Sequence, residues 1–262
     1  MLSDPRSERV KGIARLNQKD ARYETGLFLL EGFQGLKELA PHKDLIAEVF
    51  ATEAAVDARP ELFANLPVEL TLVDDRVMDR IADTRTPQGV VCVVYQLDVD
   101  LELIINDKPK LVALLDQVRD PGNAGTILRA ADAAGADGIV FSKESVDLYN
   151  PKLVRSTTGS LFHLPTVIEA DPADALADLK AAGMQVFAAA SGGKPVTELG
   201  ADLEKPTVWI FGNEAHGITS DLMDLADEVV GLPIYGSAES LNLATAASVC
   251  LYQSAFAQNR SR

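Results

Sequence analysis

Apolar runs of strand length alternate with amphipathic stretches along most of the chain, a pattern that predicts an α/β fold with parallel strand pairing. In the N-terminal half, the strands are expected over residues 27–30, 45–51, 68–73 and 89–95, and the helices over 6–18, 32–39, 60–65 and 74–82. In the C-terminal half, the strands are expected over 111–115, 138–142, 162–167, 185–190, 207–212 and 228–232. Helices are expected there over 124–134 and 151–155, after Asp171-Pro172, and over 241–257.

Between residues 96 and 110 the pattern loosens into alternating acidic and aliphatic residues. The stretches on either side have the length of ordinary domains. We therefore predict a first domain over residues 1–97, a linker over 98–110 and a second domain over 111–262.

Composition supports a folded chain without covalent staples. Of its 262 residues, 47% are hydrophobic and 24% are charged, which excludes wholesale disorder. Cys92 and Cys250 stand far apart in apolar stretches, so both are interpreted as small buried residues and not as metal ligands. The charged N-terminal stretch and the lack of any long apolar run argue against a signal peptide and a membrane helix, so a cytoplasmic protein is expected.

The formal net charge of −15 complicates any nucleic-acid function, because strong acidity repels phosphate at long range. Only a local basic face must meet phosphate, however, and residues 1–22 carry six basic and three acidic side chains. A single helix from Arg6 would place Lys11, Arg15, Lys19 and Arg22 on one face. A merely solvated helix face is the alternative.

The first of three polar stretches runs from Asp116 to Arg129, directly after a predicted strand. Ligands in open α/β sheets lie at the carboxyl ends of strands, so such stretches are the first candidates for a site. Gly122 and Gly125 would let the backbone approach an anion closely at a helix N-terminus. Their spacing matches neither the dinucleotide-binding fingerprint nor a phosphate-binding loop, which disfavours a dehydrogenase. An ordinary helix-start loop with a surface Arg129 is the alternative.

The other two polar stretches also follow apolar strands in the C-terminal half. One places Glu214 at a strand tip, and the nearby His216 is interpreted as a solvated loop residue more readily than as a general base. In the other, Ser240 is a plausible N-cap for the last helix. That interpretation leaves Asn242 unexplained, because asparagine is unfavourable inside a helix.

Taken in order, the three stretches closely resemble the three motifs of the SpoU-type RNA ribose 2′-O-methyltransferases of the SPOUT superfamily. The motifs read Asn123-x-Gly125-x-x-x-Arg129, Phe211-Gly-Asn-Glu214 and Leu232-Pro-Ile-x-Gly-x-x-x-Ser240-Leu-Asn242. Residues 154–165 resemble the family's segment between its first two motifs. Residues 9–32 and 83–90 resemble the ribosomal-protein-like substrate-binding domain of the rRNA-modifying branch, so the likeness covers nearly the whole chain.

The resemblance implies a C-terminal domain whose chain passes through a trefoil knot. It implies S-adenosylmethionine as cofactor, held largely by backbone groups, no metal, and a homodimer with the active site at the subunit interface. By motif, the residues that line the cofactor pocket are Gly212, Leu232, Ile234 and Leu241. Those of the catalytic surround are Asn123, Arg129, Glu214, Ser240 and Asn242. RNA binding falls to the smaller N-terminal domain, where the candidates are Arg9, Lys11, Arg15 and Arg22.

The implied reaction is methyl transfer to a ribose 2′-hydroxyl of RNA. A guanidinium holds its proton too firmly to act as a base, so Arg129 is expected to grip the adjacent phosphate and orient the hydroxyl. Ribosomal RNA, 23S above all, is favoured over tRNA. A tRNA 2′-O-methyltransferase, an antibiotic-resistance role, and a catalytically silent RNA-binding or ribosome-assembly protein on the same scaffold stay open as alternatives.

Overall fold

The computed structural model describes residues 1–260, whose contacts divide into two compact units. The first unit consists of Met1–Leu97 and Tyr149–Phe162, and the second of Asp98–Leu148 and the chain from His163 onward. Residues 149–162 were expected in the second domain. They belong to the first unit because the Tyr149 ring packs 4.8 Å from that of Phe28, and its hydroxyl accepts a 2.8 Å hydrogen bond from the Leu97 backbone.

The stretch 98–110 is also more than the predicted linker. It contains helix α7 (Leu101–Asn106), whose Ile104 is fully buried in the core of the second unit. The loose sequence pattern reflects the shortness of this helix, which presents a single buried side chain to the core.

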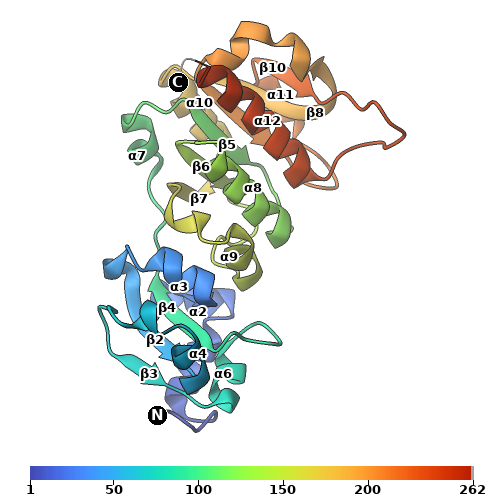
Figure 1. Ribbon diagram of the computed structural model, residues 1–262. Helices are drawn as coiled ribbons and strands as arrows, with labels where there is room; N and C mark the ends of the chain where they lie inside the picture. The colour runs from blue at the N-terminus through green and yellow to red at the C-terminus, as the bar shows by residue number, and fades with distance from the viewer. Residues whose placement is uncertain (261–262) are drawn as a thin grey trace. The chain divides into compact units, whose positions relative to one another are not determined.

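The first unit is built on a four-stranded mixed sheet (Figure 1). Its spatial order is β1 (Leu27–Glu31), β4 (Val90–Tyr95), β2 (Ile46–Ala51) and β3 (Leu70–Leu72). β4 runs antiparallel to both neighbours, whereas β2 and β3 are parallel. Residues 90–94 of β4 are all buried, which explains the run of valines in a central strand.

Short helices surround this sheet. They are α1 (Glu8–Arg15), α2 (Lys19–Thr25), α3 (Phe33–Leu39), α4 (Glu53–Ala58), α5 (Pro60–Phe63), α6 (Asp75–Ile81) and α9 (Pro151–Thr157), with 3-10 turns η1 (Lys43–Leu45) and η2 (Ser160–Phe162). The predicted helix over residues 6–18 ends early, since α1 closes at Arg15 and the chain restarts as α2.

The second unit contains a six-stranded, all-parallel sheet. Its order is β10 (Glu228–Gly231), β8 (Gln185–Pro195), β9 (Thr207–Phe211), β5 (Leu111–Leu115), β6 (Gly138–Ser142) and β7 (Thr166–Ala170). The remaining helices are α8 (Pro121–Ala133), α10 (Pro172–Ala181), α11 (Ser220–Asp224) and α12 (Leu243–Gln258), with 3-10 turns η3 (Val196–Glu198) and η4 (Gly200–Glu204). The α/β class with a parallel sheet is thus confirmed, whereas the knotted path stays a prediction.

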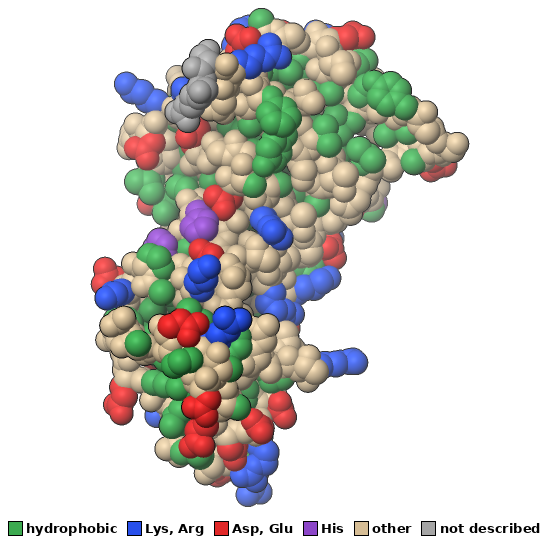
Figure 2. Space-filling view, in the orientation of Figure 1, with side chains coloured by type: hydrophobic (Ala, Val, Ile, Leu, Met, Phe, Trp, Pro, Cys, Tyr) green, Lys and Arg blue, Asp and Glu red, His purple; other side chains and the backbone are tan. Residues whose placement is uncertain are grey.

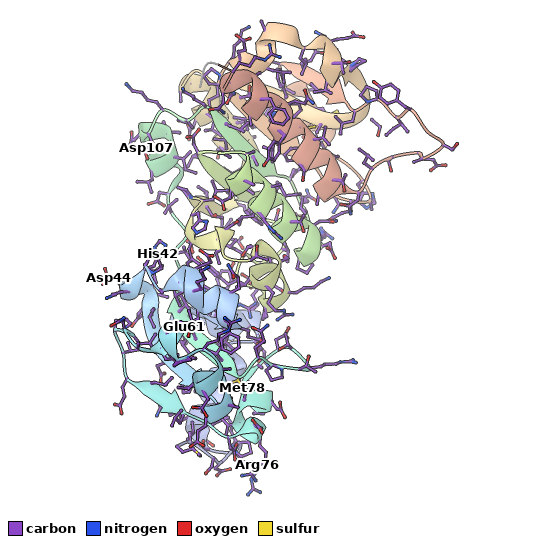
Figure 3. All side chains as sticks on the ribbon, in the orientation of Figure 1. His42, Asp44, Glu61, Arg76, Met78 and Asp107 are labelled. Carbon is purple, nitrogen blue, oxygen red and sulfur yellow. The ribbon has the colours of Figure 1, made fainter. Side chains whose placement is uncertain are left out.

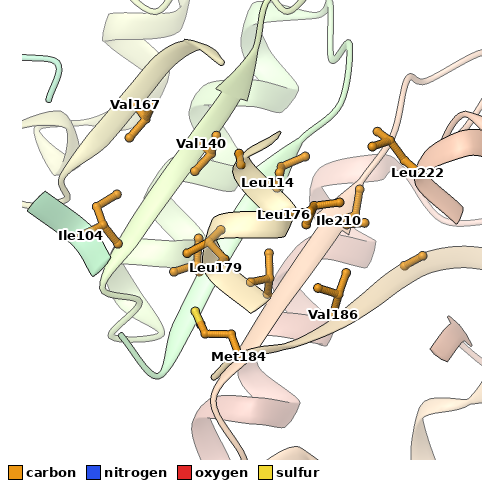
Figure 4. Packing of buried hydrophobic residues seen from close by; sticks show 14 of the residues in the cluster. Ile104, Leu114, Val140, Val167, Leu176, Leu179, Met184, Val186, Ile210 and Leu222 are labelled. Atoms are coloured by element: carbon orange, nitrogen blue, oxygen red, sulfur yellow. The ribbon is translucent and has the colours of Figure 1, made fainter. Parts of the chain in front are cut away.

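The core of the second unit lies against this sheet (Figure 4). Side chains of β5, β6 and β9, among them Leu114, Val140 and Ile210, pack with Leu176 and Leu179 of α10. α12 packs on α8 and against β5 and β9. The buried Trp209 indole N–H donates a 2.9 Å hydrogen bond to the Ser254 hydroxyl, so the one polar group of this large side chain is satisfied.

The order of the strands fixes where a ligand can bind. From β5 the chain winds outward through β6 and β7 and then returns to build β8, β9 and β10 on the other side, so β5 and β9 meet at a topological switch point. Leu115 pairs with Phe211, and the Asp116 backbone N–H donates to the Phe211 carbonyl at 2.8 Å. The polar loops that follow these two strands therefore leave the sheet side by side.

Burial confirms the expectation about the two cysteines. Cys92 and Cys250 are free and buried, as predicted, and burial raises the pKa of each thiol to about 12. Within residues 1–260, no helix has the length and apolar character needed to cross a membrane.

Candidate active site at the β5/β9 switch point

Glu214, which follows β9, ties together the loops after the two central strands. Its carboxylate accepts hydrogen bonds from the backbone N–H groups of Arg119 (3.2 Å) and Asp120 (3.1 Å) and from Asn123 Nδ2 (3.1 Å). Burial raises the pKa of this carboxyl, but hydrogen bonds from its own backbone and from those three donors outweigh burial and hold the pKa below the usual value. Such a carboxylate is a poor proton acceptor, so its evident role is to position the loop.

Asn123 and Asn242 connect these two loops to the third polar stretch. The Asn242 amide donates from Nδ2 to Asn123 Oδ1 at 2.9 Å. Its Oδ1 accepts from the backbone N–H groups of Ala244 (2.9 Å) and Thr245 (3.2 Å). Asn242 is therefore the N-cap of α12, and the predicted cap at Ser240 is wrong because the helix begins at Leu243.

Ser240 itself is exposed in the loop that precedes this helix. Together, Glu214, Asn123 and Asn242 form a chain of hydrogen bonds that links all three polar stretches at the carboxyl edge of the sheet.

Helix α8 begins earlier than expected. Asp120 is its N-cap and accepts from the Asn123 backbone N–H at 2.8 Å, and Pro121 occupies the first helical position. An Asp-Pro pair is a helix-start signal, and the same signal correctly predicted the start of α10. The first turn of α8 thus presents Asn123 to Glu214.

Asn213 is a positioning residue that the motif analysis did not single out. Its Nδ2 donates to the Gln117 carbonyl at 2.8 Å, and its Oδ1 accepts from the backbone N–H groups of Ala215 (2.9 Å) and His216 (3.2 Å). An asparagine after a strand-ending glycine is typical of such a side-chain-stabilised turn. His216 is exposed, as the solvated-loop interpretation expected.

Asp116 is a buried carboxyl group at the carboxyl end of β5 that was also missed. It is 2% exposed and accepts one long hydrogen bond, 3.5 Å, from the Thr219 backbone. Burial, and to a lesser extent Glu144, raise its pKa, and the bond from Thr219 opposes them only in part. A carboxyl with so little compensation is held by the fold at a cost in stability.

Arg129 is not brought into this cluster within the chain. It lies six positions after Asn123 on α8, which places the two side chains about 120° apart around the helix axis. Arg129 is exposed, and no ion pair joins it to any other residue in the described part of the chain. It shares the face of Gly122 and Thr126, which points to solvent.

Two of the residues expected to line the cofactor pocket are close in sequence to the hydrogen-bonded residues, since Gly212 precedes Asn213 and Glu214, and Leu241 precedes Asn242. Gly212 directly follows β9, and a Cβ there would lie 2.3 Å from the Gly217 carbonyl carbon and the Ile218 nitrogen, so only glycine fits. Leu232, Ile234 and Leu241 lie in the segment between β10 and α12, which loops out from the body of the unit (Figure 1).

Two properties distinguish this 232–241 segment. Among residues 1–260, none of its backbone N–H or carbonyl groups is hydrogen-bonded to another backbone group. It also carries exposed apolar side chains, with Ile234 39% and Leu241 41% exposed. Free backbone donors and acceptors next to apolar side chains are the usual composition of a small-molecule site.

The four residues of the predicted RNA-binding face in the first unit are either buried or paired with a carboxylate. Arg22 is wrong as an RNA contact, because it is 2% exposed and its guanidinium donates a 2.8 Å hydrogen bond to the Leu16 carbonyl inside the fold. The other three candidates each face a carboxylate, in the pairs Arg9–Glu48, Lys11–Glu8 and Arg15–Glu24. Since α1 ends at Arg15 and α2 begins at Lys19, the predicted face of Lys11, Arg15, Lys19 and Arg22 is divided between two helices.

No group of three or more His, Cys, Asp or Glu side chains in the described chain is placed to hold a metal ion.

Comparison with known proteins places both units in families. Residues 110–252 match the family model described as the SpoU rRNA methylase family, and residues 7–92 match that of the MRM3-like substrate binding domain. The first range covers most of the second unit together with residues 149–162 of the first, and the second range covers the N-terminal part of the first unit.

Whole-chain relatives agree. The chain is 31% identical to the 23S rRNA (guanosine(2553)-2′-O)-methyltransferase RlmP of Bacillus subtilis, over 96% of this chain and 97% of that one. It is 32% identical to the 23S rRNA (uridine(2479)-2′-O)-methyltransferase of Streptomyces viridochromogenes, over 92% and 86%. The crystal structure of an AdoMet-bound rRNA methyltransferase from Sinorhizobium meliloti superposes with a TM-score of 0.84 at 32% identity, over 97% and 96%. The chain therefore belongs to the SpoU rRNA methylase family, in the two-domain form that carries an MRM3-like substrate binding domain.

Proposed function

We propose that this protein transfers the methyl group of S-adenosylmethionine to a ribose 2′-hydroxyl of RNA, with 23S ribosomal RNA as the substrate. The observation that carries the proposal is the chain of hydrogen bonds from Glu214 through Asn123 to Asn242. It assembles three polar loops at the switch point of a parallel sheet, where this class of fold binds its ligands. The substrates named for the B. subtilis and S. viridochromogenes relatives support the choice of RNA.

The residues of the second unit fit S-adenosylmethionine. Gly212 allows the Gly217–Ile218 backbone to pack directly against the residue that follows β9, and the 232–241 segment offers unpaired backbone donors and acceptors for polar groups. Ile234 and Leu241 offer apolar contact area. When bound, the cofactor supplies a methyl group already activated by its sulfonium. The task left to the protein is to position the RNA hydroxyl, and good positioning alone is worth about 7–11 kcal/mol of the barrier.

We assign Arg129 to the substrate. Its exposed guanidinium is permanently charged and has a planar donor array that suits bidentate binding of a phosphate. Holding the phosphate next to the target ribose would orient the 2′-hydroxyl for attack. Glu214, Asn123 and Asn242 act through the loops that they hold together, and Ser240 lies in the adjacent loop, exposed to substrate.

We further propose that the protein acts as a homodimer through α12. Val249 is 37% and Phe256 63% exposed on this helix, and the Phe256 ring packs 5.4 Å from that of Tyr252. Figure 2 shows apolar side chains gathered over the face of α12. Apolar side chains of this size on one helix face favour burial against a second copy of the chain. Such a copy would complete the site by bringing its Arg129 to the Asn123 loop.

The test is methyl transfer by the purified full-length chain. An unmodified 23S rRNA transcript, a bulk tRNA preparation and S-adenosylmethionine with a labelled methyl group are the reagents, and the 2′-O-methylated position is mapped by reverse-transcription stops at low nucleotide concentration. We expect label in the 23S transcript at a single ribose. The relatives act on different nucleotides of 23S rRNA, so the mapping also identifies the target.

Each alternative gives a different result in the same assay. Label in tRNA alone would assign the protein to tRNA. Binding of S-adenosylmethionine and RNA without transfer to either would show a catalytically silent protein. The Arg129→Ala variant is the control for chemistry, since it should bind the cofactor normally and lose transfer.

A further inference from the structure

A cavity of about 290 Å³ lies within the first unit. It is bounded by the end of β1, the start of α3, the loop over residues 83–89 and helix α9, all of which belong to that unit. Helix α9 carries part of the 154–165 segment, a sequence feature to which neither the cofactor site nor the tie at β5 and β9 gives a role.

One wall of the cavity is held by a buried carboxylate. The Glu31 side chain is only 6% exposed and accepts hydrogen bonds from the backbone N–H groups of Asp83 (2.6 Å) and Thr84 (3.4 Å) and from the Thr84 hydroxyl (2.8 Å). The loop that follows α6 is thus fixed to the end of β1. The cavity is a built feature of the fold and not a gap beside a loose loop.

Arg155 of α9 also lines the cavity, and it has an unused donor. Its Nη2 lies 2.8 Å from Asp83, and its Nη1 lies 3.6 Å from Glu31, too far for a hydrogen bond. Nη1 is buried and has no hydrogen-bond partner in the described structure. Buried donors in folded proteins are nearly always paired, so this atom points to an acceptor on a ligand.

Gln88 adds a second donor on the cavity lining. Its Oε1 accepts from the Phe33 backbone N–H at 2.9 Å, which fixes the amide and leaves its NH₂ group for a ligand. A Cβ at Gly32 would lie 2.8 Å from the same Oε1, and Gly32 has φ +90°, so glycine is required for this arrangement. Thr86 contributes a further exposed side chain to the lining.

Arg85 stands on the same loop, between Thr84 and Thr86, and is exposed. In the part of the chain that the structure describes, it forms no ion pair, unlike the arginines and the lysine of α1, which each face a carboxylate. Arg85 lines a neighbouring hollow, to which Thr86 and Gln88 also contribute, and not the cavity itself. An unpaired guanidinium beside a cavity is suited to a phosphate.

We propose that this cavity receives one unstacked nucleobase of the RNA substrate while Arg85 binds an adjacent phosphate. The inference rests on the proposed function and names how the first unit recognises its RNA. Proteins read RNA sequence chiefly through single-stranded bases that are splayed into pockets and hydrogen-bonded on their edges. Two N–H donors, from Arg155 and Gln88, match a base edge with two acceptors, of which the O6 and N7 edge of guanine is the closest fit.

The cavity volume agrees with this occupant. It lies just below the range for small-molecule pockets, about 300–1,000 Å³, which suits one base and not a longer stretch of RNA.

Two substitutions test the proposal separately for phosphate and base. Arg85→Glu reverses the charge beside the cavity, and Thr86→Trp places an indole where the base would lie. Both residues are exposed, so neither change should prevent folding, and thermal unfolding checks this. Lys43→Glu is the charge-matched control on the same unit, between the residues His42 and Asp44 labelled in Figure 3, and Thr86→Ser is the control for size.

The measurement is the dissociation constant of the full-length chain for a 23S rRNA transcript by filter binding at fixed salt. We expect Arg85→Glu and Thr86→Trp each to weaken binding tenfold or more, and the two controls to change it less than twofold. Equal binding by Thr86→Trp and Thr86→Ser would overturn the base pocket, and equal weakening by Lys43→Glu and Arg85→Glu would overturn the assignment of the phosphate.

A second measurement locates the contact directly. Photocrosslinking of a transcript that contains 4-thiouridine, followed by mass spectrometry, should yield crosslinked peptides from residues 81–89 or 152–159. Crosslinks confined to other parts of the first unit would contradict the proposal. Failure of the proposed function is a distinct outcome, because the unsubstituted chain would then transfer no methyl group, whatever its RNA contacts.

Discussion

Asn242 Nδ2 donates a 2.9 Å hydrogen bond to Oδ1 of Asn123, a residue 119 positions earlier in the chain. The same Asn242 side chain caps α12 through its other atom, so one amide serves two purposes. The position of the last helix is thereby coupled to the loop after β5, and through Asn123 to Glu214.

Asn242→Asp separates these two purposes. Aspartate caps helices as well as asparagine, so we expect the unfolding free energy to change by less than about 0.5 kcal/mol. The donor to Asn123 is lost, however, and a second carboxylate enters a site that already holds Glu214. Methyl transfer should fall at least tenfold. Asn242→Ala is the comparison, because it removes the cap as well and should cost about 1 kcal/mol in thermal unfolding. Full transfer by Asn242→Asp would show that the amide chain is dispensable.

Glu214→Gln tests the hydrogen bonds that the Glu214 carboxylate accepts. The three donors that surround the carboxylate would face an amide with one oxygen and an NH₂ group of its own, so at least one hydrogen bond is lost. With a partly exposed group we expect a loss of about 1 kcal/mol at neutral pH, measured by urea unfolding. Methyl transfer should fall by more than this loss of stability would explain, because the loops that Glu214 holds together carry the site residues.

The stability difference between the wild type and Glu214→Gln is also expected to depend on pH. The folded-state pKa of Glu214 lies below its ordinary value of 4.5, so its contribution to stability is complete above that pH and is lost as the pH falls toward the folded pKa. The stability difference between the wild type and Glu214→Gln should therefore shrink below about pH 4.5. A difference that grows with acidity would show that the carboxylate is not stabilised in its charged form.

The frame of this site could be predicted from the sequence alone. β5 and β9 are fully buried apolar runs that end in polar residues, and in a parallel sheet such runs are easily recognised. The residues of the three polar stretches could be identified as site candidates because they directly follow predicted strands. The hydrogen bond from Asn242 to Asn123 could not be predicted, because it joins residues 119 positions apart.

Other differences have similar physical causes. Arg22 was expected at the surface because the helical pattern was continued through residues 16–18, where the chain turns and the guanidinium folds back onto the Leu16 carbonyl. Residues 149–162 were expected in the second domain because periodicity describes only neighbours in sequence. Their membership in the first unit rests on contacts such as that of Tyr149 with Phe28, which no local pattern encodes.

Asp116→Asn should stabilise the protein. The folded-state pKa of Asp116 is raised above its ordinary value of 3.8, so the buried charge is unfavourable at neutral pH, and asparagine keeps an oxygen for the Thr219 backbone. We expect a higher melting temperature for Asp116→Asn at pH 7. Because the wild-type carboxyl takes up its proton more readily in the folded state, the advantage should shrink as the pH falls toward 3.8. An unchanged or lower melting temperature at pH 7 would indicate that the charge is compensated by a group outside the chain.

Arg129 provides the test of the homodimer. Arg129→Ala alters an exposed side chain and should leave stability within about 0.5 kcal/mol, while Asn123→Ala breaks the tie to Glu214 and Asn242. Each variant alone should be inactive in methyl transfer.

If one protomer supplies Arg129 and its partner supplies Asn123, a heterodimer of the two variants contains one intact site. Unfolding and refolding an equal mixture should then restore about a quarter of wild-type activity, since half of the randomly formed dimers are mixed and each has one working site of two. A mixture that stays inactive would place both residues in one protomer's site. Arg129→Lys in the same assay, with near-full turnover at saturating RNA, would contradict the bidentate grip on phosphate.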